Sequence, residues 1–112
     1  MSDKIEFLLR KANEEQDHQE VVRIAFENRA DLNKNSLNLS IRSAYSLGDF
    51  ESALDLSRGA SKSYPDESMF VLFEARSLNQ MDEKNRALDV YERLVASHPD
   101  VQEPYIMLAR AR

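Results

Sequence analysis

Residues 50–66 read FESALDLSRGASKSYPD, and residues 84–100 read KNRALDVYERLVASHPD. Positions of the first stretch recur 34 residues later in the second, among them Ala53 as Ala87, Leu54 as Leu88, and Pro65-Asp66 as Pro99-Asp100. Several matches at one fixed offset of this length are typical of proteins built from stacked repeats. The chain is therefore expected to consist of repeated units of paired helices.

The spacing of apolar residues is helical on both sides of these stretches. The prolines that close them stand where a helix must stop, because proline lacks a backbone N–H. Gly48-Asp49 predicts a tight turn between two helices. Asp100 and Glu103 have the spacing of a capping box at the last helix, where Pro104 falls in the first turn. The whole pattern predicts seven helices, near residues 2–13, 17–31, 35–47, 50–63, 67–80, 83–97 and 101–112.

Composition limits the class of protein. At 112 residues, with 42% hydrophobic and 31% charged side chains, the chain is expected to fold as one domain rather than to stay disordered. Its 20 acidic and 15 basic residues give a net charge of -5, which disfavours nucleic acid as a partner. The sequence has no cysteine, which leaves the redox compartment open. It has no signal-peptide pattern and no apolar run of membrane-spanning length, so we expect no membrane insertion and a soluble, cytoplasmic protein. We divide the domain, residues 1–112, into units at about 2–33, 34–67 and 68–100, with a partial unit at 101–112.

Six features of the sequence carry a family resemblance: Ala53, Ala87, Pro65, Pro99, the turn Leu47-Gly48-Asp49-Phe50 and the stretch Tyr105-x-x-Leu108-Ala109. Together they resemble the tetratricopeptide repeat (TPR) family over nearly the whole chain. The resemblance implies an all-α fold, a right-handed superhelical array (α-solenoid) of antiparallel helix pairs, with three pairs and a final helix. It also implies a protein–protein interaction scaffold, in which the first helix of each pair lines a concave groove for a partner.

An arginine stands at the same place in each expected first helix, and these residues are Arg10, Arg42, Arg76 and Arg110. The resemblance implies that this place faces the concave groove. Arginine suits a binding groove because its planar guanidinium binds carboxylates through paired hydrogen bonds while its stem covers apolar surface. We therefore expect a protein or peptide partner, acidic in character, bound by Arg10, Asn13, Asn38, Arg42, Tyr45, Met69, Leu72, Phe73, Arg76, Asn79 and Arg110. The alternative is that each arginine is a solvated residue paired within its own repeat, as Glu6 and Arg10 at i, i+4 suggest.

Residues 69–73 read MFVLF, which is a broader apolar run than one buried helix face requires. In the functional interpretation, Met69, Leu72 and Phe73 form an apolar floor beside the arginines. In the alternative, the run belongs to a helix in the middle of the array that touches neighbours on two sides.

Residues 105–109, YIMLA, form a similar run in the last helix, where a pairing helix is expected but the chain stops. Such a surface should be covered, either by more chain of a longer protein, by a second copy, or by a partner. We expect an oligomer interface at Tyr105, Ile106 and Leu108.

Catalytic and metal-binding chemistry has little support in the sequence. His18 and His98 are the only histidines, and each lies near a helix boundary without a second histidine at ligand spacing, so we interpret both as surface or capping residues. No glycine-rich phosphate loop, nucleophile elbow or metal motif is present. We expect no enzyme activity and no cofactor. Three functions stay open, in this order: a peptide-binding scaffold, a self-association module, and a regulatory segment attached to an enzyme.

Overall fold

The computed structural model of the chain describes residues 2–111, and all of their regular structure is helical, with no strand. The α-helices are α1 (Ser2–Glu14), α2 (His18–Glu27), α3 (Lys34–Leu47), α4 (Phe50–Ser63), α5 (Ser68–Gln80), α6 (Lys84–Ser97) and α7 (Glu103–Arg110), and a 3-10 turn, η1 (Arg29–Asp31), follows α2. The predicted all-α class is confirmed. Helices α1, α3, α4, α5 and α6 begin and end within one residue of their predicted bounds.

The prediction for α2 is wrong at its C-terminal end, because the helix stops at Glu27 instead of residue 31. Asn28 closes it, with both its backbone N–H and its side-chain amide donating to the carbonyl of Ile24, at 3.1 and 2.9 Å. The 3-10 turn then brings Arg29 to α4, where its guanidinium donates to the two carboxylate oxygens of Asp55 at 2.8 and 2.9 Å. The early end of α2 is thus followed directly by a contact with α4.

The predicted start of the last helix is also wrong, because α7 begins at Glu103 rather than at residue 101. Gln102 is its N-cap residue and makes no side-chain capping hydrogen bond, while Pro104 lies in the first turn as predicted. The capping box of Asp100 and Glu103 does not form, since the Glu103 carboxylate accepts hydrogen bonds from a guanidinium of α5 instead. The predicted end of this helix, Arg112, lies outside the described residues.

The turn between α3 and α4 follows from two adjacent residues. Gly48 has a φ of +78°, a left-handed conformation that glycine adopts without the steric cost of a Cβ. Asp49 then caps α4, and its carboxylate accepts hydrogen bonds from the backbone N–H and the hydroxyl of Ser52 at 3.2 and 2.7 Å. The turn predicted from Gly48-Asp49 is confirmed.

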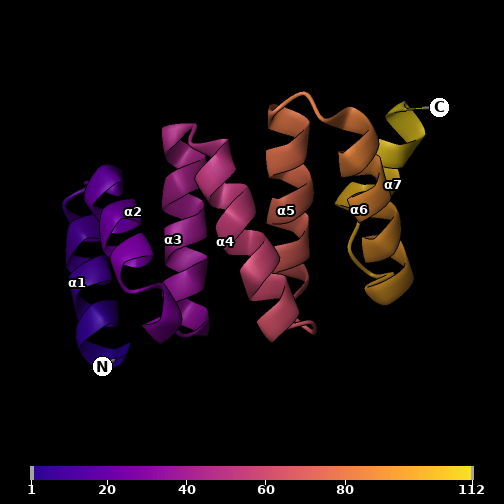
Figure 1. Ribbon diagram of the computed structural model, residues 1–112. Coiled ribbons are helices and arrows are strands. Elements are labelled where there is room, and N and C mark those ends of the chain that lie inside the picture. The colour runs from indigo at the N-terminus through magenta and orange to yellow at the C-terminus, as the bar shows by residue number, and fades with distance from the viewer. Residues whose placement is uncertain (1, 112) are drawn as a thin grey trace.

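Each helix packs against the next one along the chain, while α1 also contacts α3 and α3 contacts α5. Figure 1 shows the helices following one another from α1 to α7 along an elongated row, whose extents are 45 × 25 × 19 Å. One cluster of buried apolar side chains joins α1 to α5, and a second joins α4 to α6, with α7 packed on its edge. Helix α5 contributes to both clusters, as expected for a helix with neighbours on two sides. Within residues 2–111, no helix combines the length and the apolar composition needed to cross a lipid bilayer.

Candidate functional site

The predicted arginines lie on four different helices, with Arg10 on α1, Arg42 on α3, Arg76 on α5 and Arg110 on α7. The structure brings the first three together in steps, because α1 contacts α3 and α3 contacts α5. Arg10 and Arg42 line a common hollow of about 200 Å³, together with Glu6, Asn35, Asn38 and Leu39. We call the exposed side of α1, α3 and α5 that carries Arg10, Arg42 and Arg76 the arginine face.

Arg42 and Arg76 meet over one aromatic ring. The guanidinium carbons of Arg42 and Arg76 lie 5.3 and 5.2 Å from the ring centroid of Phe73, within the range of cation–π attraction. Tyr45 packs edge-on against the same ring, with 5.5 Å between centroids, and its hydroxyl accepts a hydrogen bond of 3.4 Å from Gln80. Phe73 is consequently only 5% exposed, so it supports the two arginines from below rather than presenting its own surface.

Arg76 is already paired with a carboxylate. Its Nε and Nη2 donate to Glu103 at 2.9 and 2.6 Å, so the guanidinium of α5 holds both carboxylate oxygens of the first residue of α7. The Tyr91 hydroxyl donates to the same carboxylate at 3.3 Å. Hydrogen bonding from Arg76 lowers the pKa of Glu103, and the same contact raises the pKa of Arg76. Burial is the main reason that the pKa of Tyr91 is raised.

Arg10 is paired as the alternative interpretation predicts, with a carboxylate of its own helix. Its Nη2 lies 2.6 Å from Glu6, four residues earlier. The other oxygen of Glu6 accepts a hydrogen bond of 2.7 Å from Asn33, which caps α3. The Arg10 side chain is 63% exposed, so this pair adds little to stability, and Arg10 stays accessible.

Arg42 differs from both of these arginines. Its Nε donates to the neutral Asn38 amide oxygen at 3.2 Å, and no carboxylate of residues 2–111 forms an ion pair with it. The residue is exposed. Arg42 therefore offers a charged group with unused donors, Nη1 and Nη2, on an aromatic support.

The remaining predicted residues are dispersed. Leu72 is 5% exposed in the second core cluster, so it has no surface for a ligand, while Met69 is half-buried against both clusters. Asn13 is half-buried on α1. Asn79 and Arg110 line a separate hollow of about 250 Å³ between α5, α6 and α7. Neither residue lines the hollow beside Arg10 and Arg42.

The predicted interface on α7 divides in two. Tyr105 and Ile106 are 46% and 50% exposed, whereas Leu108 is half-buried against the second core cluster. At the other end of the row, Phe7 is 65% exposed. Phe7 was not among the predicted residues, because it lies outside the apolar stripe that predicts α1. Glu103 was not predicted as the partner of Arg76 either, since nothing local to either residue signals a contact across 27 positions.

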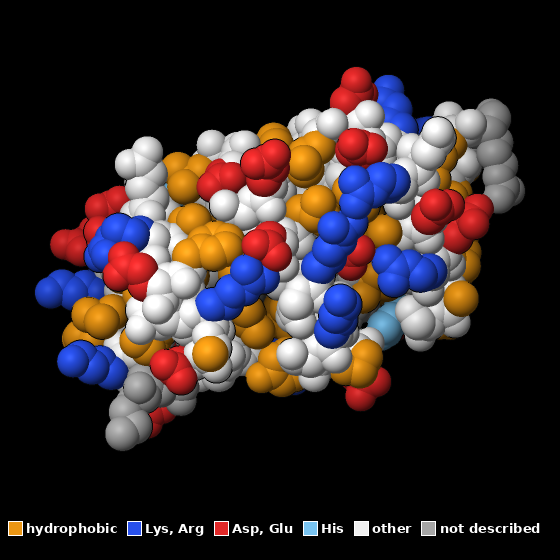
Figure 2. All heavy atoms as spheres, viewed as in Figure 1, with side chains coloured by type: hydrophobic (Ala, Val, Ile, Leu, Met, Phe, Trp, Pro, Cys, Tyr) orange, Lys and Arg blue, Asp and Glu red, His pale blue; other side chains and the backbone are white. Residues whose placement is uncertain are grey.

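Other charged and polar side chains form ion pairs or hydrogen-bond contacts within the chain. Figure 2 shows basic and acidic side chains interspersed over the region between α4 and α6, where the buried Glu74 carboxylate lies 3.2 Å from Arg93 and 3.6 Å from Arg58. His18 is half-buried and lies 3.2 Å from the Ser43 hydroxyl. His98, also half-buried, lies 3.1 Å from the Asp66 carbonyl oxygen. These contacts join neighbouring helices and turns.

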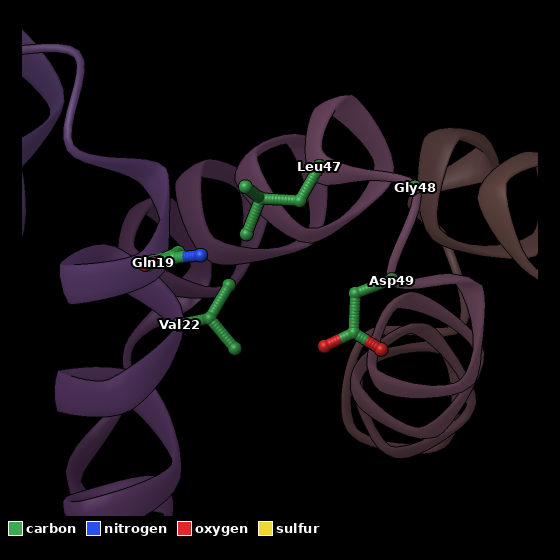
Figure 3. Close-up of a pocket in the computed structure, with 5 residues that line it drawn as sticks. All are labelled: Gln19, Val22, Leu47, Gly48 and Asp49. Carbon is green, nitrogen blue, oxygen red and sulfur yellow. The ribbon is translucent and has the colours of Figure 1, made fainter.

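A larger hollow, of about 370 Å³, opens between α2 and the α3–α4 turn. Gln19 and Val22 lie on one side of it, with Leu47, Gly48 and Asp49 on the other (Figure 3). The only charged side chain among these lining residues is Asp49, whose carboxylate already caps α4. This hollow therefore offers less binding chemistry than the smaller one beside Arg10 and Arg42.

Comparison with models of known protein families finds no match for this chain, and comparison with curated proteins finds none either. Function is therefore inferred from the geometry of residues 2–111.

Proposed function

We propose that this chain is a TPR-like α-solenoid that acts as a protein-binding scaffold rather than as an enzyme, and that its arginine face binds an acidic peptide segment of a partner protein. The 34-residue repeat supports the solenoid, as do the contacts from α1 to α3 and from α3 to α5. In this arrangement the first helices of successive units present the arginine face as one continuous surface.

Arg42 is the observation that carries the proposal. Its guanidinium is exposed, lies over the Phe73 ring and has no carboxylate partner among the described residues. Stacking on the ring and the hydrogen bond to Asn38 restrict the side chain before any ligand arrives, which lowers the entropy lost on binding. A guanidinium held in this way suits a carboxylate, which accepts two parallel hydrogen bonds from its fork.

Attraction of an acidic peptide to this face is local. The chain as a whole carries a net charge of -5, so its long-range field does not favour an acidic ligand. Binding should therefore depend on close contact with Arg42 and its neighbours.

The test is selection of peptides from a random library displayed on phage, followed by fluorescence anisotropy with the selected peptides. We expect enrichment of Asp and Glu, and Arg42→Glu should weaken binding by at least about tenfold, because a hydrogen bond to a charged group contributes on the order of 1.5–3 kcal/mol. Arg23→Glu is the matched control, since Arg23 is an exposed arginine of α2 paired with Glu20 and Glu27, outside the arginine face. Selection of peptides without acidic residues, or equal losses in the two variants, would contradict the proposal.

A second candidate function, self-association through α7, rests on the exposure of Tyr105 and Ile106. Two large apolar side chains side by side on the last helix of the row form a small patch of the kind that copies of a protein bury between them. If this is correct, sedimentation velocity will show a mass that rises with concentration, and Ile106→Glu will restore the monomer. A concentration-independent monomer would exclude this function.

A further inference from the structure

The Arg76–Glu103 contact shows how an arginine of this array holds a carboxylate, and the repeat places Arg42 at the position equivalent to Arg76. We propose that Arg42 binds a glutamate or aspartate side chain of the ligand, and that this side chain lies at the position equivalent by the repeat to that of Glu103 beside Arg76. Glu103 is then the equivalent, within the chain, of the ligand's acidic residue. The inference rests on the proposed function and specifies which chemical group occupies the arginine face and where.

The 34-residue repeat relates Arg42 to Arg76, and it relates Met69 to Glu103. In the third unit, the arginine of α5 meets the residue at this position on the next first helix, α7. In the second unit, the residue that the repeat makes equivalent to Glu103 is Met69 on α5. In the first unit it is Asn35 on α3, and Asn35 lines the same hollow as Arg10.

Charge at the neighbouring positions separates Arg42 from the other two arginines. Arg10 has the carboxylate of Glu6 at i-4, and Arg76 has the carboxylate of Glu103 on the next unit. Arg42 has a neutral amide, Asn38, at i-4, and a methionine at the position equivalent to Glu103. Among these three arginines, only Arg42 therefore forms no ion pair with a carboxylate of the described chain.

The contacts of Arg42 define the ligand group. Its Nε is engaged by Asn38, so the two oxygens of one carboxylate take Nη1 and Nη2 rather than the Nε and Nη2 that Arg76 uses. Leu39 and Met69 are both half-buried, and Leu39 lines the hollow beside Arg42. A peptide with an acidic residue next to a large apolar residue matches this combination of charge and apolar surface.

The experiment supplies the missing carboxylate from within the chain. Met69→Glu places a glutamate where the repeat places Glu103, so it should pair with Arg42 and block the ligand. The probe is a fluorescein-labelled twelve-residue peptide of alternating Glu and Leu, with a peptide of alternating Gln and Leu for comparison. Met69→Gln has the same side-chain length as Met69→Glu without the charge, and Gln19→Glu on α2 adds the same charge away from the arginine face.

We expect Met69→Glu to weaken binding of the acidic peptide by about tenfold relative to wild type and by at least about fivefold relative to Met69→Gln, whereas Gln19→Glu should bind within about twofold of wild type. Glu103→Gln should strengthen binding severalfold, because it frees the fork of Arg76 for a second ligand carboxylate. Thermal unfolding of each variant, followed by circular dichroism, shows whether it is folded before binding is measured.

The outcomes separate this inference from the proposed function. In one outcome, wild type binds the peptide, Arg42→Glu does not, and Met69→Glu binds like Met69→Gln. The arginine face is then a binding site, but the ligand's carboxylate does not occupy the position equivalent to Glu103. If wild type binds the acidic and the glutamine peptides equally or binds neither, the proposed function and this inference both fail. Loss of binding specific to Met69→Glu, with a gain in Glu103→Gln, would support the inference.

Discussion

The Arg76–Glu103 pair gives the sharpest test of how these helices pack, because it joins α5 to α7 through two hydrogen bonds of 2.9 and 2.6 Å. The perturbation is a double-mutant cycle with Arg76→Met, Glu103→Gln and the double variant. Methionine keeps an apolar stem over the Phe73 ring, and glutamine keeps the shape of glutamate. The loss of the cation–π contact of Arg76 occurs on both sides of the cycle and therefore cancels.

The expected magnitude follows from distance and exposure. Two charges about 4 Å apart attract by about 1 kcal/mol in water and about 4 kcal/mol at the effective dielectric constant near a protein surface. The two side chains are 31% and 32% exposed, so the pair is neither fully solvated nor fully buried. After the costs of desolvation and side-chain ordering, we expect a coupling free energy of about 1–1.5 kcal/mol at pH 7, slightly above the range of fully exposed pairs.

The coupling must also depend on pH with a defined sign. The pKa of Glu103 in the folded chain is lowered from its ordinary value of 4.5 by the hydrogen bonds from Arg76. The stabilisation is therefore complete above pH 4.5 and is lost as the pH falls through the lowered pKa of the folded state. Urea denaturation of the four proteins at pH 7 and at about pH 2.5 measures this change. A coupling below about 0.3 kcal/mol at pH 7, or the same value at both pH values, would refute the reasoning.

Three further predictions concern unfolding free energies measured by urea denaturation. Leu9→Ala should destabilise the chain by about 2–5 kcal/mol because Leu9 is 0% exposed, whereas Phe7→Ala should cost less than about 1 kcal/mol because Phe7 is 65% exposed. Similar losses in the two variants would mean that α1 is rotated relative to the core. Gly48→Ala should cost about 1–2 kcal/mol, because the φ of +78° strains any residue with a Cβ; an unchanged stability would show a different turn. Tyr91→Phe should cost about 0.5–1.5 kcal/mol in the wild-type chain, and less in the Glu103→Gln background because the charged acceptor of the hydrogen bond is gone. Equal losses in both backgrounds would argue against the Tyr91–Glu103 hydrogen bond.

Local features of the sequence were sufficient to place most helices. The α3–α4 turn depends on Gly48, which adopts a left-handed conformation, and on Asp49, which caps the helix that starts immediately after it. Both interactions lie within a few residues of the chain, so the sequence pattern contains all the partners. For the same reason α4 begins and ends at its predicted residues.

The candidate site was predictable only in part. The repeat located Arg10, Arg42 and Arg76 at matching helix positions, and the pairing of Arg10 with Glu6 follows from i, i+4 spacing. The apolar run over residues 69–73 did not reveal which side chains reach the surface. Leu72 is buried and Met69 is half-buried because α5 has neighbours on two sides, and that arrangement arises only when the helices are packed.

The sequence by itself determined the helices, their turns and their repeat, because backbone hydrogen bonds and caps join residues that are close along the chain. Only the tertiary structure decided that Arg29 pairs with Asp55 of α4, and that Glu103 pairs with Arg76 rather than forming the predicted capping box. These pairs are separated by 26 and 27 residues. Their formation depends on how neighbouring helices pack, and the same packing leaves Arg42 without an ion pair to a carboxylate of the described residues.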